Sequence, residues 1–222
     1  MTSPCRLGLL GGSFDPVHVG HLHAARTAQE ARALDRVVFV PAARPPHKPG
    51  RRLAAGEHRL AMLRLALAGE LSWTVSDLEL SRSGPSYTID TVRALPAEVG
   101  EPEAQVFLIL GYDNLAGLPG WHEARSLLTL ARPLIVWRAG DGASGDGASG
   151  DGGPPAGLPA TVRSLPPELV ARIQEGFLPT SCVPARATDL RAALARGETR
   201  LAELPEAVGE YIREHGLYRE EP

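Results

Sequence analysis

Apolar runs that no polar residue interrupts recur along the first two thirds of the chain. RLGLLGG (6–12), RVVFVP (36–41), QVFLILG (105–111) and RPLIVWR (132–138) are continuous, and LSWTVSDLEL (71–80) passes from apolar into polar residues. Continuous rather than alternating apolar strands are typical of parallel sheets covered on both faces. The pattern therefore predicts a parallel sheet built from these segments.

Segments with helical patterns separate the strands. They comprise the alanine-rich stretch 19–33, the amphipathic stretch 59–68, and the stretches 86–95, 166–175, 188–196 and 204–218. In the last of these Val208, Tyr211, Ile212 and Leu217 can share one face. Alternating strands and helices predict an α/β fold, Rossmann-like, with an open parallel sheet, helices on both faces and right-handed crossovers. Residues 188–218 would add a small helical C-terminal part.

The stretch AGDGASGDGASGDGGPPAG (139–157) repeats DGASG and contains no large apolar residue. Such a segment cannot contribute to a packed core, so it is expected to be a mobile surface loop. The chain has 222 residues, of which 43% are hydrophobic. We therefore expect a single domain over 1–222 that carries this insert.

The charge and cysteine content narrow the class of protein. Lys and Arg number 23 against 26 Asp and Glu, a net charge of −3, so no global basic field favours nucleic-acid binding. Any phosphate recognition must then be local. Cys5 and Cys182 lie far apart without metal-ligand spacing, and no run has the length of a signal or membrane segment. A reduced, soluble, cytoplasmic protein without membrane partners is the expectation.

The stretch GGSFDPVHVGHLHAA (11–25) carries the strongest candidate chemistry. A strand that ends in two glycines and leads into a helix near Val19 favours an anion at the helix N-terminus. His18 and His21 are three residues apart, so both can point toward that anion and donate to phosphate oxygens. His23 is off that face, and without a third ligand a metal site is disfavoured. The glycine spacing is not the dinucleotide fingerprint, which disfavours a dehydrogenase.

The string GGSFDPVHVGH resembles the signature of the HxGH nucleotidyltransferase superfamily. The resemblance implies transfer of a nucleotidyl group from a nucleoside triphosphate, with His18 and His21 as the catalytic residues that bind the triphosphate and stabilise the transition state at the α-phosphate. It places ATP also against Gly11, Gly12, Ser13, Phe14 and Gly20. Asp15 is assigned to the acceptor mononucleotide, although its residue type also suits orienting a histidine or lying near magnesium.

Later segments resemble those of bacterial nicotinate mononucleotide adenylyltransferases. PPHK in the basic loop PAARPPHKPGRR (41–52) implies that His47 and Lys48 contact ATP phosphates. The segment SYTIDT (86–91) implies a mononucleotide pocket lined by Tyr87 and Thr88 and shaped by Asp90.

The segment LGYDNLAGLPGWHEA (110–124) supplies a further match. The resemblance implies that Trp121 stacks on the pyridine ring of the mononucleotide, although a lone Trp is more often core. It places Gly111 and Asp113 on the adenosine side, together with Arg138 after the last strand.

Near the C-terminus, ARATDLRAAL (185–194) matches the family only in part. Thr188 and Arg191 are kept and would bind ATP, and Thr188 is expected to cap a helix. Arg186 and Ala187 stand where the family has serines, so two hydroxyls are lost and Arg186 is a candidate to compensate.

The resemblance implies that ATP and nicotinate mononucleotide give nicotinate adenine dinucleotide and pyrophosphate, with Mg²⁺ bound to ATP. The acceptor phosphate is already an anion, so no general base is required, and alignment with charge neutralisation can provide the catalysis. Three alternatives stay open: nicotinamide mononucleotide as acceptor, a pantetheine-phosphate adenylyltransferase, and a nucleotide-binding module without activity. Intact His18 and His21 disfavour the last.

Overall fold

The computed structural model describes residues 3–44, 53–137, 157–179, 183, 185–198 and 200–219. Its single described sheet has five parallel strands in the order β3-β2-β1-β4-β5. The strands are β1 (Arg6–Gly12), β2 (Arg36–Pro41), β3 (Trp73–Val75), β4 (Gln105–Gly111) and β5 (Arg132–Val136). The parallel sheet expected from the continuous apolar runs is confirmed.

Two strands are shorter than the sequence pattern suggested. β3 ends at Val75, where the Ser76 hydroxyl donates to Glu98 and accepts from the backbone N–H of Leu78. These side-chain bonds turn the chain away from the ladder. β5 ends at Val136, and the indole of Trp137 donates to the Leu178 carbonyl at 3.0 Å.

All six predicted helical segments contain a helix, and two short helices that the sequence pattern did not indicate lie before and after β5. The helices are α1 (Val19–Arg32), α2 (Gly56–Ala66), α3 (Thr88–Glu98), α4 (Ala124–Leu130), α5 (Ala160–Arg163), α6 (Pro167–Glu175), α7 (Ala187–Ala195) and α8 (Glu206–Glu214). Two short 3₁₀ turns, Tyr112–Asn114 and Leu118–Gly120, follow β4. The predicted insert lies, except for Gly157, outside the described residues.

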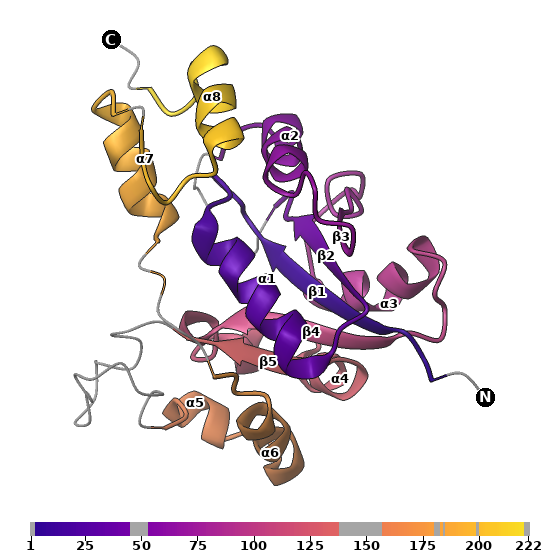
Figure 1. Cartoon of the computed structure of the whole chain (residues 1–222). Helices are drawn as coiled ribbons and strands as arrows, with labels where there is room; N and C mark the ends of the chain where they lie inside the picture. Colours follow the sequence, from indigo (N-terminus) through magenta and orange to yellow (C-terminus); the bar gives the residue numbers. More distant parts are fainter. Residues whose placement is uncertain are drawn as a thin grey trace.

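Each face of the sheet has its own hydrophobic core. Alternate strand residues such as Val37 and Phe39 pack with residues of α1, α2, α7 and α8. Their neighbours Val38 and Val40 pack with residues of α3, α4, α5 and α6. Burial on both faces explains why the strands are apolar throughout. The C-terminal helices thus belong to the same core as α1 and α2, and Figure 1 shows α7 and α8 beside the end at which α1 begins.

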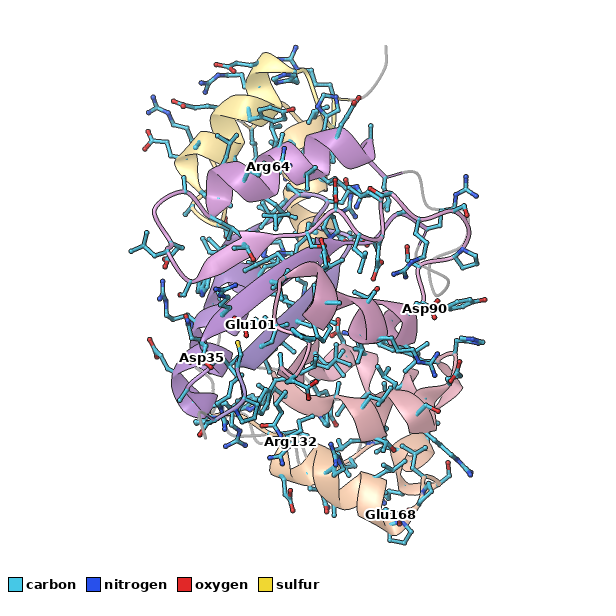
Figure 2. The ribbon with its side chains drawn as sticks, turned by 90° about the vertical axis from the view of Figure 1, so that its right-hand side faces the viewer. Asp35, Arg64, Asp90, Glu101, Arg132 and Glu168 are labelled. Carbon is cyan, nitrogen blue, oxygen red and sulfur yellow. The ribbon has the colours of Figure 1, made fainter. Side chains whose placement is uncertain are left out.

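The strand order places the switch point of the sheet between β1 and β4. From β1 the chain proceeds outward to β2 and β3, and then returns to add β4 and β5 on the other side. Ligands of open α/β sheets bind outside the carboxyl ends of the strands at such a point. Asp35, Glu101 and Arg132 lie at the opposite, amino-terminal ends of the strands, before or at the starts of β2, β4 and β5 (Figure 2). A ligand site is therefore expected at the carboxyl ends of β1 and β4, away from these three charged residues.

Within the described ranges, every helix is too short or too polar to cross a membrane.

Candidate active site

A cavity of about 380 Å³ opens at the switch point. Its floor is formed by Gly11 at the end of β1 and Gly111 at the end of β4, and its walls by the starts of α1 and α7. The structure brings together eight of the residues predicted to bind substrates: Gly11, His18, Gly20, His21, Gly111, Asp113, Trp121 and Thr188. Residues more than 170 positions apart in the sequence thus line one cavity.

His18 and His21 form a close pair. Their ring centroids are 3.9 Å apart, and the backbone N–H of His18 donates to Nδ1 of His21 at 3.3 Å. Because Nδ1 accepts this bond, the neutral His21 ring carries its proton on Nε2 and presents that nitrogen as a donor. His18 is the N-cap of α1 and is only 6% exposed. The predicted pairing of the two rings on one side of the helix start is confirmed.

Two neighbours fix these rings. Phe14 is buried and meets the His21 ring edge-on, with centroids 4.9 Å apart. A Cβ atom at Gly20 would lie 3.0 Å from Cε1 and Nδ1 of His18, so any larger residue would displace that ring. The resemblance places Gly20 against ATP, and the structure adds that the missing side chain makes room for the His18 ring.

The start of α7 forms the opposite wall. Here the sequence interpretation was wrong in one respect: Arg186, not Thr188, is the N-cap of α7. Arg186 is extended (φ −128°, ψ 124°), and its carbonyl accepts from the backbone N–H of Asp189. Thr188 is the second helical residue, and its hydroxyl accepts from Arg191 at 3.3 Å. Arg186, Ala187 and Thr188 all line the cavity.

Trp121 combines both interpretations that the sequence allowed. It packs against the hydrophobic core on the α3–α6 face and also lines the cavity. The ring of Tyr87 is stacked on that of His122, the residue after Trp121, with centroids 4.2 Å apart. Tyr87 and Thr88 stand at the start of α3 and are not on the cavity wall.

Asp15 and Arg191 lie behind the wall rather than on it. Asp15 is 2% exposed, and its Oδ1 accepts from the Tyr218 hydroxyl at 2.8 Å and from the Ala54 backbone N–H at 3.1 Å. Arg191 donates to the Asp15 carbonyl at 2.6 Å. These contacts hold the loop before α1 to the C-terminal part of the chain. Gly12 and Ser13 likewise are not among the lining residues.

Comparisons with known proteins agree with this geometry. A model of the cytidylyltransferase-like family matches residues 9–165. A protein of Roseiflexus sp. (strain RS-1) named "Probable nicotinate-nucleotide adenylyltransferase" is 41% identical over 98% of this chain and 100% of its own length. A protein of Gloeobacter violaceus with the same name is 41% identical over 96% of each chain. The chain belongs to the nicotinate-nucleotide adenylyltransferase family.

Solved structures of this enzyme class share the fold. Plasmodium falciparum nicotinic acid mononucleotide adenylyltransferase, solved as complexes with APC and with NaAD, matches with a TM-score of 0.67 at 15% identity. The match covers 96% of this chain and 97% of that one. The Rossmann-like nucleotidyltransferase fold expected from the sequence is confirmed.

Some family positions were missed or cannot be placed. His47, Lys48 and Arg138 lie outside the described residues, so their roles stay predictions. His23, to which the sequence assigned no role, also lines the cavity, because the cavity extends along the start of α1 toward α7. The wall also includes residues to which the sequence analysis gave no role, among them Ala24, Asn114, Trp137 and Ala185.

The described wall offers little to a divalent metal ion by itself. Within the part of the chain that the structure describes, no three His, Cys, Asp or Glu side chains gather as metal ligands would. Asp113 is the acidic side chain on the described wall. This donor set fits a metal ion that is bound mainly by phosphate oxygens and water rather than by the protein.

Proposed function

We propose that this cavity transfers AMP from ATP to nicotinate mononucleotide, giving nicotinate adenine dinucleotide and pyrophosphate. The observation that carries the proposal is the His18–His21 pair at the switch point of the sheet, in one cavity with Trp121 and Thr188. Close full-length relatives that bear the same enzyme name support it. The cytoplasmic location and the single-domain organisation remain part of the proposal.

The proposed chemistry follows from what the wall can donate. The acceptor phosphate is an anion, so its attack on the α-phosphorus of ATP needs alignment and charge neutralisation rather than a general base. His18 and His21 donate to oxygens around the α-phosphorus, where negative charge is redistributed as the bond to pyrophosphate breaks. Gly20, the second residue of α1, adds a backbone N–H without an intrahelical acceptor.

The adenosine part of ATP and the acceptor mononucleotide would contact the remaining residues of the cavity wall. Gly111 and Asp113 would face the adenosine, and Trp121 would stack on the pyridine ring of the acceptor. Mg²⁺ carried in by ATP would be held mainly by phosphate oxygens and water, because the described wall offers no cluster of metal-ligating side chains. The ion, when bound, neutralises part of the triphosphate charge.

The proposed activity is tested by offering purified protein ATP, Mg²⁺ and one acceptor at a time. The acceptors are nicotinate mononucleotide, nicotinamide mononucleotide and phosphopantetheine, and the readouts are pyrophosphate release and product identity. We expect the highest kcat/KM with nicotinate mononucleotide. Preference for either other acceptor, or ATP binding without turnover, would assign the cavity to one of the alternative functions.

Arg186 is expected to contribute to ATP binding in place of the serine hydroxyls that the family has there. Its side chain stands at the start of α7, on the cavity wall that faces His18 and His21. Arg186→Ala should raise the KM for ATP about five-fold and leave the KM for the acceptor unchanged, because an exposed charge–phosphate contact is screened by water. Steady-state kinetics measures both constants.

Arg64→Ala is the matched control. Arg64 is also exposed and lies on α2 (Figure 2), and it is not among the residues that line the cavity. Both variants change the net charge equally, so a general electrostatic effect would raise the KM for ATP in both. An unchanged KM for ATP in Arg186→Ala would show that Arg186 is simply solvated.

A further inference from the structure

Three contacts from the C-terminal part reach the segment that carries His18. The Tyr218 hydroxyl donates to Oδ1 of Asp15 at 2.8 Å, across 203 positions of sequence. Arg191 donates to the Asp15 carbonyl at 2.6 Å, and its Nη1 lies 3.7 Å from Oδ2. The backbone N–H of Val19 donates to the Glu203 carbonyl at 2.9 Å. His18 therefore lies between two anchored positions, Asp15 and Val19.

The anchoring site is buried and charged. Asp15 and Arg59 are each 2% exposed, and Arg59 donates to the carbonyls of Ser13 at 2.8 Å and Ala54 at 2.9 Å. Burial, and then the charge of Asp15, raise the pKa of the Tyr218 hydroxyl above its ordinary value. The hydroxyl therefore remains protonated and continues to donate throughout the neutral range. Hydrogen bonds to a buried charge are among the stronger ones in proteins.

The loop transmits this constraint directly to the histidine. Only Pro16 and Val17 separate Asp15 from His18, and Val17 is fully buried. The His18 ring also packs on the His21 ring, and it occupies the space that a side chain at position 20 would need. A shift of Asp15 would therefore move the His18 ring, whereas Gly11 and Gly111 at the floor of the cavity are held by their pairing with Val40 and Val136 in the sheet.

We propose that Tyr218 is a positioning residue of the transfer reaction, which holds Asp15 and thereby the loop that presents His18 to the α-phosphate. Arg191 acts on the same residue from α7. The proposal rests on the proposed function for its effect on rate. Tyr218 lies beyond residues 9–165, the part of the chain that matches the family model, and it does not line the cavity.

Tyr218→Phe tests the proposal, with Tyr211→Phe as a matched control. Tyr211 belongs to the same C-terminal part. Its hydroxyl lies 2.9 Å from Nδ1 of the partly buried His58, and its ring packs with those of His58 and His215 rather than with Asp15 or His18. Both substitutions keep the ring and remove one hydroxyl. We expect kcat about ten-fold lower in Tyr218→Phe, with the KM values for ATP and acceptor changed less than two-fold. Tyr211→Phe should change kcat less than two-fold.

A second substitution changes Asp15, the acceptor of the hydrogen bond from Tyr218. Asp15→Asn keeps the shape but removes the charge that faces Tyr218, Arg191 and Arg59. It should also lower kcat with little change in KM. An unchanged kcat in folded Tyr218→Phe protein, or a KM for ATP that rises as far as kcat falls, would overturn the positioning role.

A readout without turnover separates this proposal from the function on which it rests. In a spectrum of histidine ring Cε1–H groups, the resonance of His18 should move in Tyr218→Phe and stay in place in Tyr211→Phe. The resonance of His58 should show the reverse. A His18 resonance that is unchanged in Tyr218→Phe would overturn the positioning role even if the wild type is active. A wild type without turnover, with the His18 resonance moved, would overturn only the proposed function.

Discussion

His21→Ala is expected to lower kcat by about 100- to 1000-fold, the range seen when one preorganised donor to a developing charge is lost. The ring is held between His18 and Phe14, with centroid distances of 3.9 and 4.9 Å, so its donor is fixed before substrate binds. A donor that acts mainly in the transition state lowers kcat more than it raises the KM for ATP. Steady-state pyrophosphate release gives both constants.

His215→Ala serves as the control for this substitution. His215 stacks on Tyr211 with centroids 3.9 Å apart and lies away from the cavity wall. Its kcat should match that of the wild type. Circular dichroism should show nearly the same helix content in both variants, because the buried residues of α1 are Ala24, Ala25 and Ala28. Near-normal turnover in His21→Ala would refute the role given to this residue.

Gly176→Ala is expected to lower the free energy of unfolding by about 3 kcal/mol, at the upper end for overpacking. A Cβ atom here would lie 2.2 Å from the Pro133 carbonyl oxygen, which is backbone and cannot rotate away. The Gly176 carbonyl accepts from Ile135, and Ile135 in turn accepts from the backbone N–H of Leu178, so residues 176–178 run alongside β5. Relief of the clash must separate these two segments.

Thermal denaturation measures the loss. For a chain of this size about 3 kcal/mol corresponds to a Tm lower by about 6–12 °C. Gly120→Ala is the control, because a Cβ atom at Gly120 meets nothing within 4 Å. Its effect should stay within about 0.5 kcal/mol. Equal losses in the two variants would mean that the chain relaxes around the added methyl group at position 176 without cost.

The sheet could be predicted from the sequence because its signal is local. Each strand is buried on both faces, so runs such as RVVFVP and QVFLILG carry no polar interruption. Val19 begins α1, as the sequence indicated, whereas α3 begins at Thr88, two residues after the predicted start. Element ends were less predictable, because Ser76 at the end of β3 and Arg186 at the start of α7 act through side-chain and backbone bonds that no periodicity encodes.

The site could be predicted where its residues lie in one short motif. His18 and His21 were identified by their spacing and by the glycine-rich strand end before them. Tyr218, Glu203 and Arg59 were not, because they reach the motif only through long-range contacts of the folded chain. His23 is off the face of His18 and His21 in helical spacing, and the cavity extends far enough along the start of α1 to include it. Local patterns thus found the donors but not the residues that hold them.

The fate of the phosphate groups of ATP tests the central claim most directly. Wild-type protein is incubated with Mg²⁺, nicotinate mononucleotide and ATP carrying a phosphorus label at either the α- or the γ-position. Attack at the α-phosphorus predicts that the α-label appears in nicotinate adenine dinucleotide and the γ-label in pyrophosphate, in equal amounts. A γ-label in the acceptor, or an α-label confined to AMP or ADP, would contradict nucleotidyl transfer by this site.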